Sequence, residues 1–249
     1  MIYVNEIDPY CAQWLQNLMD ADVLPPGHID TRSIEDVTPN DLAGYAQCHF
    51  FAGLGGWIYA LDLAGWPRDR PVWTGSCPCQ PFSAAGKRTG FADERHLWPV
   101  WQHLIAQRKP ATVFGEQVEA AIKHGWLDGV VGDMEGLGYA CGSAVLQASS
   151  ANAPHRRDRV WFVADAERHQ QSREESCSRT AGRMGGKQQP VPWDGTWEDA
   201  LTRFGALDDG IQRRVEATDA ARNAIVPQVA AEFIAAFMSI VGNEHDPRW

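Results

Sequence analysis

Short runs of apolar residues alternate with amphipathic segments along most of the chain. Runs rich in β-branched and aromatic residues predict buried strands, and they cover residues 1–4, 29–34, 45–52, 71–74, 112–114, 140–146 and 159–164. Apolar positions at helical spacing predict helices over residues 9–20, 57–64, 98–107, 125–136 and 223–241. This alternation of strands and helices predicts an α/β fold with a doubly wound, mostly parallel sheet of the Rossmann-like kind.

One segment departs from this pattern. Residues 166–192 carry many Gln, Ser, Arg, Glu and Gly residues and few apolar ones, which is typical of a flexible insertion or a small recognition element. The sequence therefore predicts an α/β domain over 1–165, a small separate region over 166–215, and a C-terminal helix within 216–249 that returns to the first domain.

Composition narrows the class of protein. A length of 249 residues suits one α/β domain with a small appendage. The chain has no run of about 18 apolar residues, and its N-terminus lacks a basic segment followed by an apolar one. We therefore expect a cytoplasmic protein without a membrane span. The six cysteines show neither CxxC spacing nor a His/Cys cluster, so we expect free thiols and no metal site.

Net charge gives an ambiguous signal about nucleic acid. The chain carries a net charge of −10, whereas nucleic-acid-binding proteins usually present a basic face. Between Arg156 and Lys187, however, eight Lys and Arg residues stand against five acidic ones. Such a stretch can bind phosphate, although a solvated polar surface would have the same composition.

The most informative residues lie in a loop after the predicted strand 71–74. Cys79 stands there between Pro78 and Gln80, in the string Gly-Ser-Cys-Pro-Cys-Gln-Pro-Phe-Ser that ends at Ser83. A cysteine exposed in such a loop can act as a thiolate nucleophile, whereas an isolated Pro-Cys pair is usually structural. The continuous string Pro-Cys-Gln-Pro-Phe-Ser resembles the signature loop of the DNA cytosine-C5 methyltransferases. The resemblance implies that Cys79 is the covalent nucleophile and that Pro78, Gln80 and Ser83 contact the substrate.

A glycine-rich turn follows the predicted strand 45–52. Its sequence, Phe-Ala-Gly-Leu-Gly-Gly, resembles the cofactor loop of the same family, and such a turn lets the backbone come close to a ligand. The resemblance implies that S-adenosylmethionine is bound by Phe51, Gly53, Gly55 and Gly56. His49 stands at the position where the family usually has an acidic residue for the methionyl amine.

Two further motifs match the family's catalytic residues. Gly-Glu-Gln-Val at 115–118 resembles its Glu-Asn-Val motif, with Gln117 in place of Asn. The resemblance implies that Glu116 holds the cytosine at N3 and at its exocyclic amine, and a carboxyl in a closed site can have its pKa raised enough to share a proton. His-Arg-Arg-Asp-Arg resembles the Gln-x-Arg-x-Arg motif, with His155 in place of Gln. Arg157 and Arg159 would face the same side of an extended segment, and the resemblance implies contacts with the cytosine O2, the active-site loop and phosphate.

The C-terminal helix follows a last motif. Asn-Ala-Ile-Val-Pro at 223–227 resembles the family's Gly-Asn-Ala-Val-Pro, with Arg222 in place of Gly. The resemblance implies that Asn223 helps to close the site over the cofactor. Pro227 is predicted to lie in the first turn of the helix, where proline is tolerated.

The order of the cofactor segments is unusual. In the family, the glycine loop comes first, and strands ending in a ribose-binding Glu and an adenine-reading Asp follow it. Only 21 residues separate Gly56 from Pro78, too few for both strands. Two N-terminal segments resemble the missing ones, with Glu6 as the ribose acceptor and Asp30 as the adenine acceptor. We therefore expect a local permutation, which a sheet tolerates when the connections stay short and do not cross.

These resemblances imply a DNA cytosine-C5 methyltransferase that flips its target base out of double-stranded DNA. We expect S-adenosylmethionine as cofactor, no metal and a monomer. The small size of the chain and of its recognition region favours an enzyme carried by a phage or a mobile element. Residues 166–215 would read the DNA sequence, with Trp193 and Trp197 as anchors. Two alternatives stay open: an inactive DNA-binding relative, and an enzyme of this scaffold that acts on RNA or uses another donor. A nicotinamide dehydrogenase would leave the Cys79 loop unexplained.

Overall fold

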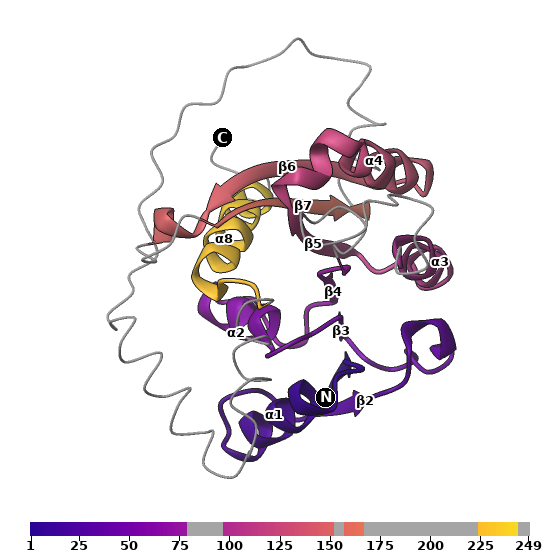
Figure 1. Cartoon of the computed structure of the whole chain (residues 1–249), viewed down its shortest axis with the longest axis vertical. Coiled ribbons are helices and arrows are strands. Elements are labelled where there is room, and N and C mark those ends of the chain that lie inside the picture. Colours follow the sequence, from indigo (N-terminus) through magenta and orange to yellow (C-terminus); the bar gives the residue numbers. More distant parts are fainter. Residues whose placement is uncertain (79–96, 152–156, 167–223, 244–249) are drawn as a thin grey trace.

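A computed structural model describes residues 1–78, 97–151, 157–166 and 224–243. One seven-stranded sheet forms its centre, in the order β2-β1-β3-β4-β5-β7-β6 (Figure 1). The strands are β1 (Ile2–Asn5), β2 (Gly27–Asp30), β3 (Gln47–Phe50), β4 (Val72–Gly75), β5 (Thr112–Val118), β6 (Ala140–Gln147) and β7 (Asp158–Asp165). Neighbours from β2 to β5 are parallel, and β7 runs antiparallel to both β5 and β6. The predicted doubly wound, mostly parallel sheet is confirmed.

Helices cover both faces of the sheet (Figure 1). One face carries α1 (Pro9–Asp20), α2 (Gly56–Leu63) and α8 (Pro227–Asn243), and the other carries α3 (Trp98–Arg108) and α4 (Trp126–Gly136). The short helices η1 (Ile34–Asp36), η3 (Glu119–His124) and η4 (Ala148–Ala151) are of the 3-10 type. None of these described helices is long and apolar enough to cross a membrane.

Local sequence signals explain where α1 begins. Asp8 is the N-cap, and its Oδ1 accepts hydrogen bonds from the backbone nitrogens of Tyr10 and Cys11 at 2.9 and 3.0 Å. Pro9 occupies the first helical turn, where a missing N–H has no cost. Asp8 and Pro9 therefore start a helix only three residues after Glu6, and the chain turns back along the sheet there.

Three apolar clusters fill the space between sheet and helices. A cluster rich in aromatic rings lies under α3 and α4, and a second packs α2 and α8 on the sheet. The third, which we call the α1 cluster, draws all its buried members from residues 2–58, among them Val4, Leu15 and Ile58. Burial of large side chains on both faces therefore holds the central strands in place.

The chain order of the strands agrees with the expected permutation. β1 lies between β2 and β3, and its residue Asn5 pairs with both Asp30 and Phe50. The N-terminal strands are thus the spatial neighbours of the strand that leads into the glycine-rich loop.

Three predicted boundaries were wrong. The strand expected over 29–34 ends at Asp30, because the Asp30 Oδ1 accepts the backbone N–H of Arg32 at 3.0 Å and turns the chain out of the sheet. The strand expected to end at Phe114 continues to Val118, because β7 pairs with it over its whole length. The last helix begins at Pro227.

Candidate functional site

The carboxyl ends of the parallel strands lie in one row. Strand register pairs the last residues of the neighbours, in the order Asp30, Asn5, Phe50, Gly75 and, within β5, Gly115. The residues one position further on are therefore also neighbours. These are Thr31, Glu6, Phe51, Ser76 and Glu116. The structure brings the predicted cofactor residues Glu6, Asp30 and Phe51 and the predicted catalytic carboxyl of Glu116 to one edge, where doubly wound sheets bind ligands.

Glu6 connects the end of β1 to the glycine-rich loop. Its Oε2 accepts a hydrogen bond from the backbone nitrogen of Gly53 at 2.6 Å, and its Oε1 accepts one from that of Asp8 at 2.9 Å. Burial raises the pKa of Glu6, and these backbone hydrogen bonds oppose the rise. A carboxylate has about four acceptor positions, so Glu6 retains capacity for a ligand hydroxyl.

The glycine-rich loop needs its glycines for two reasons. Gly53 and Gly55 have φ angles of 53° and 83°, and Phe51 shares this left-handed region at 51°. A Cβ on Gly56 would lie 2.6 Å from Cγ1 of Ile225, so the loop packs directly on the C-terminal motif. A Cβ on Gly53 would meet no atom within 4 Å. The loop therefore has open space on the side of Gly53.

Asp30 lies at the expected edge, but its carboxylate is already engaged. Its Oδ2 accepts from the Tyr3 hydroxyl at 2.8 Å and from the Nη2 of Arg32 at 2.6 Å, and its Oδ1 accepts from the backbone nitrogen of Arg32. Arg32 lowers the pKa of Asp30 to about 2. An adenine amine at Asp30 would have to displace the Arg32 side chain, which is 46% exposed.

Glu116 is a buried carboxyl that forms an ion pair with Arg159. The Nε of Arg159 lies 2.7 Å from its Oε1, at the distance of an ion pair but without hydrogen-bond alignment, and no other described residue donates to this oxygen. Burial raises the pKa of Glu116, while Arg159 and Arg157 act in the opposite direction. Such a group can hold or share a proton near neutral pH.

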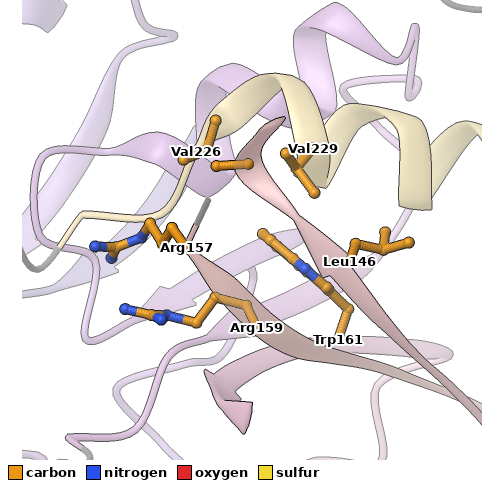
Figure 2. Close-up of a pocket in the computed structure, with 7 residues that line it drawn as sticks. Leu146, Arg157, Arg159, Trp161, Val226 and Val229 are labelled. Carbon is orange, nitrogen blue, oxygen red and sulfur yellow. The ribbon is translucent and has the colours of Figure 1, made fainter. Parts of the chain in front are cut away.

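The two predicted arginines come from the start of β7. Figure 2 shows the side chains of Arg157 and Arg159 extending in the same direction, as the sequence predicts. Arg157 has a φ of 36°, and its Nη2 donates to the backbone oxygen of Ala224 at 2.7 Å. Their stems line a pocket with Leu146, Ala148, Trp161, Val226 and Val229. The C-terminal motif is thereby tied to the edge of the sheet that carries Glu116.

The predicted nucleophile loop is only partly described. Cys79, Gln80 and Ser83 lie outside the described residues, as does Asn223, and Pro78 is the last described residue before them. Gln117 fixes the chain just ahead of this loop. Its buried Nε2 donates to the backbone oxygen of Cys77 at 3.2 Å, and its Oε1 accepts from the Val118 nitrogen at 2.9 Å.

Three side chains at this edge were missed by sequence reasoning or given no role by it. Gln117 entered only as a replacement for Asn, although its amide holds Cys77. The Nε1 of Trp57, in α2, donates to the Ser76 hydroxyl at 3.0 Å. The glycine-rich turn before Trp57 was a visible signal of a nearby site, but no pattern indicated this contact.

His49 is neutral and buried within β3. One ring nitrogen, Nδ1, lies 2.8 Å from the Thr74 hydroxyl, and burial lowers the pKa of His49 to about 3. His49 therefore supplies no negative charge at the position where an acidic residue was expected from the resemblance.

The described cysteines are unsuited to nucleophilic attack. Burial raises the pKa of Cys11 and Cys48 to about 12 and of Cys141 to about 11, and it raises the pKa of Cys77 as well. All four are free thiols. Within the described ranges, no group of three or more His, Cys, Asp and Glu side chains could hold a metal ion.

Comparison with known proteins gives a consistent match. A family model described as C-5 cytosine-specific DNA methylase matches residues 66–185, a stretch that contains Cys79, Glu116, Arg157 and Arg159. The type II methyltransferase M.HhaI of Haemophilus parahaemolyticus is 26% identical over 167 residues, which are 51% of this chain and 51% of the relative. M.CviJI of Paramecium bursaria Chlorella virus IL3A is 34% identical over 106 residues, or 42% and 29% of the two chains.

The chain spans only part of the length of these relatives, about half of M.HhaI and less than a third of M.CviJI. Among solved structures, the Dnmt2 methyltransferase of S. pombe aligns with a TM-score of 0.40 and 16% identity, over 66% of this chain and 51% of that one.

Proposed function

We propose that the chain is a member of the C-5 cytosine-specific DNA methylase family, whose model matches residues 66–185, and that it transfers a methyl group from S-adenosylmethionine to carbon 5 of cytosine in double-stranded DNA. One observation supports this most directly. The sheet places the Glu6–Gly53 contact and the buried Glu116 at the same edge, on strands joined by continuous register. A cofactor at the first would lie beside a base held by the second.

Cys79 is the proposed nucleophile. The four described cysteines have raised pKa values and are buried or partly buried, so the family loop is the natural place for the reactive thiol. Its thiolate would add to carbon 6 of a cytosine that has been flipped out of the helix, since these ring atoms are inaccessible in stacked DNA. Addition at carbon 6 would make carbon 5 nucleophilic, so that carbon 5 takes the methyl group as the sulfonium carbon–sulfur bond of the donor breaks and leaves a thioether. Loss of the carbon 5 proton to a water molecule and elimination of the Cys79 thiolate would then release 5-methylcytosine.

Glu116 would hold the flipped base during these steps. Its raised pKa favours a proton on the carboxyl, which can be shared with N3 of cytosine as the thiolate adds. Arg159 lies against the carboxyl and can also reach the cytosine O2, and Arg157 braces the C-terminal motif through Ala224. Charge that develops on the base would thus face groups already in position.

The residues present fit the proposed cofactor. Open space beside Gly53 and the spare acceptor capacity of Glu6 suit a ligand with hydroxyl groups. When bound, S-adenosylmethionine supplies an activated methyl group. The residues proposed to hold it are Glu6, Asp30, Phe51, Gly53, Gly55, Gly56 and Asn223. Glu6 would bind hydroxyls, the loop backbone would face the ligand, and Asp30 would take part only if Arg32 moves aside.

DNA recognition is assigned to residues outside the described ranges. We propose that 166–215 reads the sequence, as a separate small region beside the catalytic domain 1–165, and that Pro78, Gln80 and Ser83 contact the target nucleotide. The proposed active unit is a monomer.

One alternative also has support. The neutral His49 and the Asp30–Arg32 pair both alter positions at which the family contacts its cofactor. These changes favour a relative that binds DNA without methylating it. Cofactor binding separates the two functions, because a DNA-binding relative need not bind S-adenosylmethionine.

The decisive experiment uses S-adenosylmethionine with a tritiated methyl group. The wild-type protein is incubated with unmethylated double-stranded DNA and, separately, with RNA of the same sequence. The Cys79→Ala variant replaces the wild-type protein in a parallel pair of reactions. Labelled 5-methylcytosine in DNA, lost in the variant, is the expected result. Label in RNA alone would show that the substrate is RNA and not DNA. No label on several DNAs would overturn the proposal, and calorimetry with the cofactor would then test the DNA-binding alternative.

A further inference from the structure

Ser76 and Glu116 are neighbours across the β4–β5 pair. Each follows a glycine of the register pair Gly75 and Gly115. Register partners in a parallel pair point to the same face, and side chains alternate along each strand. Phe114 packs with residues of α2 and α8, and its register partner Thr74 points to the same face. Ser76 and Glu116, two positions further along their strands, therefore point to that face as well.

Trp57 reaches Ser76 from α2. Its ring is only 2% exposed, and it stacks on Phe114 at a centroid distance of 6.2 Å and meets Trp161 edge-on at 5.4 Å. These contacts fix the direction of the indole N–H, which donates to the Ser76 oxygen at 3.0 Å. Trp57 directly follows Gly56, so this donor belongs to the helix that begins at the glycine-rich loop.

The hydroxyl of Ser76 is therefore oriented. An indole nitrogen can only donate, so Ser76 accepts from Trp57 and keeps its own proton for another acceptor. The Glu116 carboxyl is the acceptor that the register places beside Ser76, and Ser76 acts to lower the pKa of this carboxyl. Trp57 and Ser76 thus form an oriented pair whose free hydroxyl proton can be donated to the carboxyl.

We propose that Ser76, oriented by Trp57, is a positioning residue that holds the Glu116 carboxyl and sets the upper pH limit of activity; the inference rests on the proposed methyl transfer, in which Glu116 acts protonated. The same oriented pair links the first turn of α2, beside the cofactor loop, to the group that holds the base.

The charges around Glu116 fix the sign of the effect. Arg159 on β7 and Arg157 just before it favour the carboxylate, as does the Ser76 hydroxyl, and burial opposes all three. Loss of the hydroxyl removes one of the groups that stabilise the charged form. The pKa of Glu116 then rises, and the protonated carboxyl persists to higher pH.

The first test is the pH dependence of the methylation rate. In Ser76→Ala, the alkaline limb of the pH–rate profile should move to higher pH by about 0.5–1 unit, which is the size expected for one hydrogen bond to a carboxylate. Ser76→Thr retains a hydroxyl and should restore the wild-type limb. Trp57→Phe should give a smaller shift in the same direction. Trp66→Phe is the matched control, because Trp66 is equally buried and donates to the Arg70 backbone oxygen at 3.2 Å, away from this edge.

A second measurement does not depend on activity. Carbon-13 NMR of protein labelled at the Glu side-chain carboxyls, with Glu116→Gln to assign the signal, follows the protonation of Glu116 directly. A higher pKa in Ser76→Ala than in wild type is expected. An unchanged titration in Ser76→Ala would overturn the inference, whether or not the protein methylates DNA. An inactive wild type with a shifted titration would overturn the proposed function alone.

Discussion

The carboxylate of Glu6 accepts the backbone N–H of Gly53 at 2.6 Å, across 47 residues of sequence. This contact joins the N-terminal strand to the glycine-rich loop at the point where the strand order reverses. β1 continues outward to β2, and β3 continues in the other direction to β4. Such a switch point is where doubly wound sheets open a crevice for a ligand. The permuted N-terminus therefore supplies one wall of the proposed cofactor site.

Glu6→Gln should weaken cofactor binding. The amide presents a donor where Glu6 now accepts from two backbone nitrogens, so the loop loses a charged hydrogen bond of roughly 1.5–3 kcal/mol. The dissociation constant for S-adenosylmethionine, measured by calorimetry, should rise about tenfold or more. Glu135→Gln is the control, because Glu135 is exposed on α4, on the other face of the sheet. Equal affinities for the wild type, Glu6→Gln and Glu135→Gln would show that Glu6 does not contribute to cofactor binding.

Gln117→Met should slow methyl transfer without changing cofactor affinity. The variant retains the buried volume but loses the donor to the Cys77 backbone oxygen, two residues before Cys79. A displaced nucleophile can cost roughly ten- to a hundredfold in rate, measurable in single-turnover experiments. Gln47→Met is the matched control, since Gln47 is also buried and donates to the Pro67 backbone oxygen at 3.2 Å. A similar loss of rate in both variants would indicate general destabilisation instead.

Much of this architecture could be predicted from local pattern. The helices with clear apolar spacing and the strands rich in Val, Ile and aromatic residues were found within a few residues of their true ends. The sequence also predicted that Glu6 and the glycine-rich loop belong to one site, because the distance between Gly56 and Pro78 left no room for the missing strands, but it did not predict the hydrogen bond between Glu6 and Gly53. Contacts between distant segments could not be predicted. β5 extends to Val118 only because β7, more than 40 residues away, pairs with it.

The engagement of Asp30 with Arg32 was missed for a related reason. The Arg32 side chain folds back on Asp30 because the chain turns out of the sheet between them. Hydrophobic periodicity carries no information about such turns. The Trp57–Ser76 contact likewise depends on how α2 packs on the sheet. Sequence therefore predicted where the strands end better than it predicted the hydrogen bonds that the strand-end residues make.

Gly115→Ala should destabilise the fold. A Cβ at this position would overlap the ring of Phe162, which is only 2% exposed and cannot move away from the core. Overpacking of this kind costs about 1–3 kcal/mol, and thermal unfolding should shift down by several degrees. Gly132→Ala gives the opposite expectation. Gly132 lies in α4 with open space around it, so alanine should stabilise the helix by about 0.5–1 kcal/mol.

The Asp30–Arg32 pair predicts a loss of stability in acid. Arg32 lowers the pKa of Asp30 from 3.8 to about 2 in the folded protein. A lowered pKa stabilises the fold above the unfolded value, and this contribution disappears as the pH falls through the folded value. The free energy of unfolding in urea should therefore differ between wild type and Asp30→Asn at pH 6, and the difference should shrink between about pH 4 and pH 2. Asp69→Asn, which removes an exposed carboxyl outside this pair, is the control variant.

The α1 cluster has a consequence for synthesis of the protein. Its buried members all come from residues 2–58, so every contact in it is available once residue 58 has left the ribosome. Domains generally acquire structure from the N-terminus as they are made. When β3 emerges, its neighbour β1 is already present to receive it. This strand order thus lets the part that carries Glu6 and the glycine-rich loop begin to fold before the loop that carries Cys79 has been translated.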